Sequence, residues 1–239
     1  MPTPSPAYAA TVAAHAAAAT LALAVGLVAL ASVKGGRVHR RSGRGYARAI
    51  AAVVGTGAAL MALGRATPYL ATLLLLTAYP TWSGVRVLAR RRPDADPAHR
   101  ASRTDRAFAA ATLGLALALL AATALGLGGP KAGAVRGLAP FLVAFSAYDL
   151  WRFARPAAWP MAPDLWLREH IGKLTGAYFG AVSAYAGNVA TGVPDPWPVL
   201  APNLVGVAVM AAFLVRVRRR RRPAAPGAAR AAALAGAAS

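Results

Sequence analysis

The sequence contains no cysteine and few acidic residues, and each shortage narrows what the protein can do. Without cysteine, the 239-residue chain has no disulfide, no thiolate zinc site, no cysteine-ligated iron–sulfur cluster and no cysteine nucleophile. Asp and Glu number 7 against 27 Lys and Arg, and charged residues make up 14% of the chain, below the roughly 25% of an average soluble domain. Hydrophobic residues make up 57%. This balance is typical of a membrane protein.

Signatures of common enzymes are missing as well. The chain has no His-Glu-x-x-His, no Gly-x-Ser-x-Gly and no phosphate-binding glycine loop. Its last apolar stretch has no lysine for a retinal Schiff base, which argues against a rhodopsin. Acidic residues are absent from the middle of the apolar stretches, which argues against an ion-coupled transporter. The sequence therefore indicates a protein without covalent catalysis.

Seven apolar stretches, each of about 18 to 26 residues, are long enough to cross a hydrocarbon core about 30 Å thick as helices. They cover residues 8–33, 46–63, 67–88, 107–127, 135–153, 171–193 and 199–217. We predict an all-α, polytopic transmembrane helix bundle of seven spans, forming one domain over 8–217. Residues 1–7 are a short tail, and 218–239, first basic and then rich in Ala and Pro, are expected to be a disordered cytoplasmic tail. A six-span chain with one segment lying flat is the alternative.

Basic residues mark every second gap between these stretches. Of the 27 lysines and arginines, all but Arg65, Lys131 and Arg136 lie around the gaps after the first, third, fifth and seventh stretches. Because basic loops stay in the cytoplasm, the N-terminus is expected outside and the C-terminus inside a bacterial cytoplasmic (inner) membrane. The formal charge of +20 then attracts anionic lipid. A nucleic-acid partner is not expected, because the charge does not form a patch on a soluble face.

The sixth stretch carries the most unusual pattern. Gly172, Gly176 and Gly180 recur every four residues, which predicts a smooth ridge for close helix packing. The polar residues that share a neighbouring sector of this helix are His170, Tyr178, Tyr185 and Asn188. We expect this sector to face the bundle interior, either to bond with neighbouring helices or to form a polar pocket or relay.

Histidine is the other residue type with functional potential, and His15 lies within the first stretch. It is either a hydrogen-bonded histidine of the bundle or a ligand of a metal or haem. The remaining histidines, His39, His99 and His170, fall on the predicted cytoplasmic side, so a ligand pair centred on His15 is not expected. The sequence assigns no particular metal.

A set of charged and polar residues gathers at the predicted cytoplasmic rim. Its members are Lys34, His39, Arg40, Asp105, Asp149, Arg152, Glu169, His170 and Lys173. We expect Asp105, Asp149 and Glu169 to neutralise nearby basic groups, and Asp149 can pair with Arg152 three residues along the same helix. The alternative is a proton or anion site at this rim.

Two stretches taken together resemble a family of uncharacterised bacterial integral membrane proteins. One is Lys34-Gly…His39-Arg40…Gly43…Tyr46, and the other opens at His170 and continues to Tyr185 and Asn188. The family pattern has a Met shortly after the second histidine, where this chain has Leu174 or Thr175. The resemblance spans residues 10–215 and implies no activity. It implies that His39 and His170 are positions of interest.

Three functions fit the sequence. The first is a non-enzymatic membrane component, either a structural subunit of a hetero- or homo-oligomer or a binder of lipid or a small apolar ligand. The second is a redox protein that holds haem b or contacts quinone through His170 and a partner such as His39. The third is a small-solute transporter that uses the polar sector of the sixth stretch.

Overall fold

The computed structural model describes residues 5–156, 164–190, 192–194 and 197–220. Within these ranges the chain forms seven α-helices and no strand, which confirms the all-helical prediction. The helices are α1 (Pro6–Ala31), α2 (Arg37–Leu60), α3 (Pro68–Arg86), α4 (Arg103–Ala124), α5 (Ala132–Ala154), α6 (Leu165–Val189) and α7 (Trp197–Arg220). Short turns follow α2 and α3, namely a π-turn at Met61–Arg65 and 3₁₀ turns at Val87–Ala89 and Pro97–His99.

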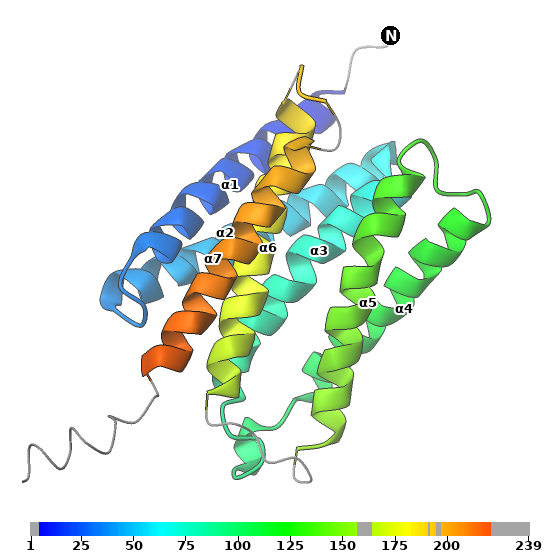
Figure 1. Cartoon of the computed structure of the whole chain (residues 1–239). Coiled ribbons are helices and arrows are strands. Elements are labelled where there is room, and N and C mark those ends of the chain that lie inside the picture. Colours follow the sequence, from blue (N-terminus) through cyan, green and yellow to red (C-terminus); the bar gives the residue numbers. More distant parts are fainter. Residues whose placement is uncertain (1–4, 157–163, 191, 195–196, 221–239) are drawn as a thin grey trace, which may run out of the picture.

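The helices stand side by side and run alternately up and down the bundle (Figure 1). Three antiparallel hairpins, α1–α2, α4–α5 and α6–α7, pack closely. The central helix α3 contacts α2, α4, α5 and α6 and so joins the hairpins. Although α5 and α6 follow one another in the sequence, their described backbones make almost no contact. The bundle is therefore open between these two helices.

Local sequence explains where the helices begin. The side chains of Ser5, Thr67 and Ser102 accept hydrogen bonds from backbone N–H groups in the first turns of α1, α3 and α4. Pro6 and Pro68 each occupy the first helical position, where the missing N–H has no intrahelical partner to lose.

Residues 34–45 separate the first two predicted spans and were expected to form a loop. This expectation is wrong for most of the segment, because α2 already begins at Arg37. Long basic side chains extend from a helix surface into polar surroundings, so hydropathy falls while the helix continues. The apolar face of α2 starts about two and a half turns later, with Tyr46, Ala49 and Ile50 buried. At the other end of the chain, α7 continues to Arg220, past the predicted start of the tail at 218. The rest of that tail lies outside the described residues.

Four helical segments are long and apolar enough to cross a membrane. They are Pro6–Ala31, Arg37–Gly64, Pro97–Ala124 and Trp197–Arg219, which contain α1, α2, α4 and α7. Of the three remaining helices, α5 and α6 carry the buried charged residues Asp149, Arg152 and Lys173, and α3 lies at the centre of the bundle (Figure 1).

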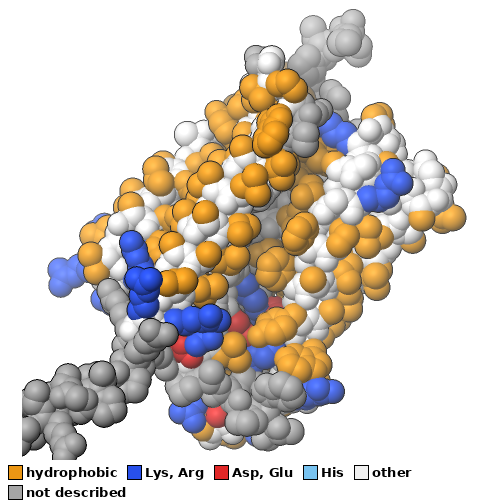
Figure 2. Space-filling model, in the orientation of Figure 1, with side chains coloured by type: hydrophobic (Ala, Val, Ile, Leu, Met, Phe, Trp, Pro, Cys, Tyr) orange, Lys and Arg blue, Asp and Glu red, His pale blue; other side chains and the backbone are white. Residues whose placement is uncertain are grey.

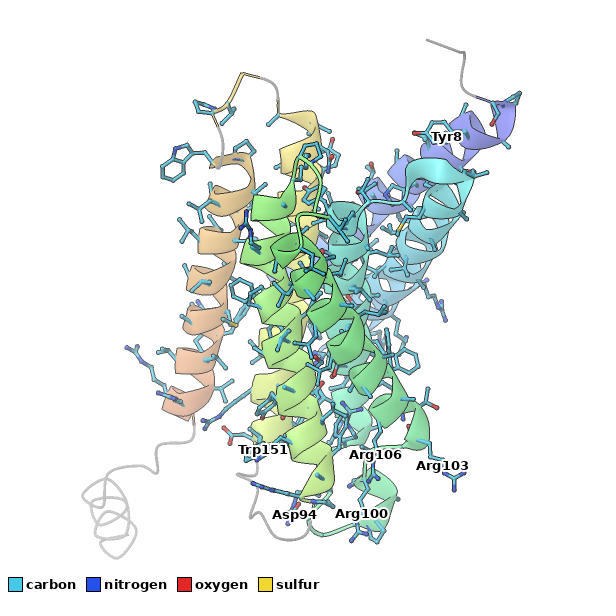
Figure 3. The ribbon with its side chains drawn as sticks, turned by 90° about the vertical axis from the view of Figure 1, so that its right-hand side faces the viewer. Tyr8, Asp94, Arg100, Arg103, Arg106 and Trp151 are labelled. Carbon is cyan, nitrogen blue, oxygen red and sulfur yellow. The ribbon has the colours of Figure 1, made fainter. Side chains whose placement is uncertain are left out.

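Basic side chains collect at one end of the bundle. This end, which we call the basic end, is formed by the last turns of α1, α3, α5 and α7 and the first turns of α2, α4 and α6. Figure 3 shows Arg100, Arg103 and Arg106 at this end together with Trp151, whereas Tyr8 lies near the opposite end. The alternation of basic gaps along the sequence therefore becomes a separation of charge along the bundle.

Candidate functional site

The basic end contains a buried ion pair between α5 and α6. Nζ of Lys173 lies 2.5 Å from Oδ1 of Asp149 and donates a hydrogen bond of 2.8 Å to Oγ of Ser83. The other carboxylate oxygen of Asp149 accepts bonds from the hydroxyls of Tyr79 (2.7 Å) and Ser83 (2.6 Å). All four side chains belong to residues no more than 3% exposed. A buried pair needs such additional hydrogen bonds to offset the loss of hydration.

A second buried pair lies beside the first, toward the end of the bundle. The guanidinium of Arg152 binds both carboxylate oxygens of Glu169, at 2.7 and 3.2 Å, and the hydroxyl of Tyr148 donates to the same carboxylate at 2.8 Å. The prediction that Asp149 pairs with Arg152 on one helix is therefore wrong in its choice of partners. Because α5 and α6 are antiparallel, Asp149 meets Lys173 and Arg152 meets Glu169 across the gap.

Asp105 connects the end of α3 to the start of α4. It closes a capping box with Ser102, and its carboxylate also accepts two bonds from Arg86, at 3.0 and 3.1 Å. Nη1 of Arg90 lies 2.8 Å from Oδ1 of Asp105 in an ion pair without hydrogen-bond alignment. Asp105 thus neutralises two arginines, as the sequence predicted for the acids of this rim, and its role is to anchor a helix.

The three carboxylates belong to one connected cluster. Arg90 reaches from Asp105 toward the backbone carbonyl of Ser83, 3.4 Å from Nη2, and Ser83 binds Asp149. A cavity of about 20 Å³, large enough for one water molecule, lies among Arg90, Asp149, Arg152 and Glu169. We call these buried side chains of α3, α5 and α6, with Arg90 and Asp105, the charge cluster.

Four polar residues of the cluster were not expected from the sequence. Tyr79, Ser83, Arg86 and Arg90 are spaced by four, three and four residues. That spacing places residues on one face of a helix, so a polar stripe through the apolar 67–88 stretch was the available signal. These residues face α4 and α5, where Arg86 donates to Asp105 and Tyr79 donates to Asp149.

The structure brings together His39 and His170, which the sequence marked as positions of interest. Their ring centroids are 6.4 Å apart. Nδ1 of His39 lies 2.9 Å from the carbonyl oxygen of Ala29, and Nδ1 of His170 lies 2.9 Å from that of Gly84. Each histidine therefore bonds to the backbone of a neighbouring helix.

His15 lies on a different pair of helices from this histidine pair. Its Nδ1 is 3.0 Å from Oγ1 of Thr56, a contact between α1 and α2. The expectation of a hydrogen-bonded histidine at this position is confirmed.

The predicted interior sector of α6 holds only in part. Tyr178 is 7% exposed and donates a hydrogen bond of 3.2 Å to the carbonyl oxygen of Leu23 on α1. Tyr185 is 50% exposed, and Asn188 donates to Ala184 of its own helix. The prediction is wrong for these two residues because α6 meets α1 near Tyr178, and Tyr185 lies about two turns beyond that contact.

The predicted packing ridge on α6 is also wrong for two of its glycines. A Cβ at Gly176 or Gly180 would meet no described atom within 4 Å, and one at Gly172 would meet only Sδ of Met210, at 3.7 Å. Close approach occurs elsewhere, at Gly84 of α3, where a Cβ would crowd Leu174 and Lys173 of α6. Helix α6 packs on α3 and α7 through other residues, and of the three glycines Gly172 lines the opening beside α5.

This opening forms a groove between α5 and α6, with a cavity of about 230 Å³. The lining residues are Phe145, Tyr148, Leu165, Arg168, Glu169, Gly172 and Lys173. Figure 2 shows the hollow between two largely hydrophobic walls, with side chains of both charge signs at its lower end. We call it the α5–α6 groove; it has mostly apolar sides and an end closed by the charge cluster.

Lys34 fixes the end of α1 close to α7. Its amine contacts the carbonyl oxygens of Ala29, at 3.0 Å, and of Leu30, and it lies 4.5 Å from the ring centroid of Phe213. Burial and the charge of nearby Arg216 lower the pKa of the Lys34 amine. Lys34 therefore serves as a cap for α1 rather than as a member of the charge cluster.

The described residues contain no group of three or more His, Asp or Glu side chains that could hold a metal ion. Comparison of the chain with protein-family models, with curated proteins and with solved structures found no match.

Proposed function

We propose that this chain is a seven-span protein of a bacterial cytoplasmic membrane that binds a lipid or another small apolar ligand in the α5–α6 groove. The observation that carries the proposal is the groove itself. Two consecutive helices are held apart along most of their length and are bridged by buried ion pairs at one end only.

Helix length and charge pairing support seven spans rather than four. Helices α3, α5 and α6 have 19, 23 and 25 residues, which gives lengths of roughly 28 to 38 Å. Their charged side chains lower their hydropathy, yet four of those side chains, Asp149, Arg152, Glu169 and Lys173, are buried and paired between α5 and α6. Ionisable groups inside a membrane are expected to face the bundle interior and to bind one another in this way.

The distribution of basic residues supports the orientation. In this proposal the basic end lies in the cytoplasm, so the N-terminus is outside and the C-terminus inside. Arginines at this end, among them Arg100, Arg103 and Arg106 in Figure 3, are then placed to attract anionic headgroups.

The chemistry of the groove favours an apolar ligand over a charged one. At its closed end each cation has a carboxylate partner, Lys173 with Asp149 and Arg152 with Glu169, so little unbalanced charge remains to select an ion. Its walls offer the rings of Phe145 and Tyr148 on α5 against Leu165 and Gly172 on α6. Sites between the helices of a bundle commonly hold apolar ligands by such shape and contact.

The test is to fill the groove without touching the charge cluster. Gly176 on α6 lies one turn beyond the groove residue Gly172, and Gly176→Leu adds a side chain where a Cβ meets no described atom within 4 Å. The control, Gly114→Leu, adds the same side chain on α4 at another exposed glycine with no described neighbour within 4 Å. The purified proteins are compared by native mass spectrometry and by analysis of extracted lipids. We expect a ligand on the wild type and on Gly114→Leu, and its loss from Gly176→Leu. Equal retention by all three proteins, or no bound ligand on the wild type, would contradict the proposal.

A further inference from the structure

The two histidines at the basic end have the arrangement of a ligand pair. His39 on α2 and His170 on α6 are both half-buried, so neither is sealed inside the bundle. Their ring planes are inclined by 78° and their centroids lie 6.4 Å apart.

The hydrogen bonds of the two rings determine which nitrogen is free. A backbone carbonyl oxygen only accepts hydrogen bonds, so in the neutral rings each Nδ1 carries the proton and donates it, to Ala29 in one case and to Gly84 in the other. The lone pair then resides on Nε2 of both rings. Histidines that bind metals are usually held in this way, with the second ring nitrogen donating to a carbonyl or a carboxylate.

The separation of the rings matches a particular coordination geometry. A ring nitrogen lies about 1.1 Å from its centroid and binds a metal at about 2.0–2.1 Å, so two imidazoles on opposite sides of one metal have centroids about 6.3 Å apart. Two imidazoles at a tetrahedral angle would be about 5 Å apart. The observed 6.4 Å agrees with the separation expected for the opposite, or trans, arrangement, in which the two Nε2 atoms face one metal.

We propose that His39 and His170 bind one transition-metal centre in trans through their Nε2 atoms. The metal is either the iron of a haem or a free ion that accepts trans imidazoles, such as Cu(II) or Ni(II). This inference is independent of the ligand in the α5–α6 groove. Lys34 and Arg40, on either side of His39 in the sequence, oppose a bare dication and can pair with the carboxylates of a haem.

The experiment uses full-length protein purified in detergent, titrated separately with haemin and with Cu(II). Three variants are compared with the wild type, namely His39→Gln, His170→Gln and His15→Gln. Glutamine retains an N–H donor for the helix contact but removes the imidazole ligand. His15→Gln is the matched control, because His15 also forms a hydrogen bond between two helices but is not part of the His39–His170 pair.

With haemin, we expect the wild type and His15→Gln to show a sharp Soret band and the low-spin spectrum of two axial imidazoles. His39→Gln and His170→Gln should each give a high-spin spectrum and bind at least about tenfold more weakly. If the source is a free ion, haemin gives no such spectrum, and Cu(II) electron paramagnetic resonance shows coupling to two nitrogens in the wild type and to one in each single variant.

Two results would overturn the inference. One is a wild type that shows neither the bis-imidazole haem spectrum nor two-nitrogen coupling with Cu(II), and this result does not depend on how the variants fold. The other is unchanged binding after His39→Gln or His170→Gln, or an equal loss after His15→Gln. In either case the two histidines serve only to tie α2 to α1 and α6 to α3.

Discussion

Lys173 and Asp149 form a 2.5 Å ion pair that joins α6 to α5 where the backbones of these helices do not meet. The pair is completed by Ser83 and Tyr79, so it also fixes both helices to α3. Side-chain chemistry thus replaces backbone packing at this corner of the bundle.

Removing one partner of this pair should cost more stability than removing both. Lys173→Met leaves the Asp149 carboxylate buried without its cation, which typically destabilises a protein by about 3–5 kcal/mol. Replacing both residues, Lys173→Met with Asp149→Leu, should be less harmful than the sum of the single changes. Unfolding in detergent by a denaturant series measures the difference, and additive effects would show that the two groups do not interact.

The control for that experiment is the Arg92–Asp94 pair in the α3–α4 connection. Its side chains are 52% and 20% exposed, and the hydrogen bond from Arg92 lowers the pKa of the Asp94 carboxyl. Because an exposed ion pair is screened by solvent, we expect Arg92→Met to leave the unfolding midpoint unchanged.

Gly84 is required by the close approach of α3 and α6. An alanine there places a Cβ about 3.0 Å from Cβ of Lys173 and also against Leu174. We expect Gly84→Ala to destabilise the protein by about 1–3 kcal/mol, because the helices must separate. Gly43→Ala on α2, where a Cβ meets no described atom within 4 Å, should be neutral or stabilising by up to about 1 kcal/mol. Thermal unfolding of the two variants compares them directly, and equal midpoints would refute the close contact.

Asp105 both caps α4 and binds two arginines, and the two roles can be separated. Asp105→Asn keeps a side-chain oxygen for the Ser102 N–H and removes the charge, whereas Asp105→Ala removes both. Loss of a helix cap costs about 1 kcal/mol, and the unpaired Arg86 and Arg90 add to it. We expect faster hydrogen exchange in the first turn of α4 for both variants, with the larger effect for alanine. Exchange as slow as in the wild type would show that packing alone holds the helix start.

The absence of cysteine makes the natural chain a background for accessibility labelling. Val33 and Leu125 are 83% and 76% exposed. They belong to the α1–α2 and α4–α5 connections, which lie at opposite ends of the bundle (Figure 1). In the proposed orientation, a membrane-impermeant thiol reagent added to intact cells labels Leu125→Cys but not Val33→Cys. The reverse pattern would invert the topology, and labelling of both would argue against a seven-span arrangement.

Much of the fold follows from hydropathy alone, because the seven apolar stretches correspond to the seven helices. The start of α2 could not be predicted in this way, because residues 37–45 are helical although their low hydropathy indicates a loop. The packing around Gly176 and Gly180 could not be predicted from the sequence either. Their spacing indicates a smooth face, yet only the positions of α5 and α7 decide whether a helix lies against it.

The residues of the charge cluster were partly visible in the sequence, but their pairing was not. Asp149, Arg152, Glu169 and Lys173 could be assigned to one rim from the positions of the apolar stretches. Which acid meets which base depends on the antiparallel register of α5 and α6, which no local pattern encodes. The prediction that Tyr185 and Asn188 face the bundle interior was wrong for a related reason. A helical wheel gives the face of a helix but not where along that face a neighbouring helix stops making contact.

The crossed pairs between α5 and α6 also constrain how the chain is made. In the proposed seven-span arrangement, Asp149 and Arg152 lie near the cytoplasmic end of α5, and the residues that they pair with, Lys173 and Glu169, belong to α6. Their partners are translated only with α6, which ends about 35 residues later, or roughly 2–7 s at typical elongation rates of 5–20 residues per second. Until α6 has been made, these two side chains lack the partners that they have in the folded bundle, so we expect α5 to reach its final packing only together with α6.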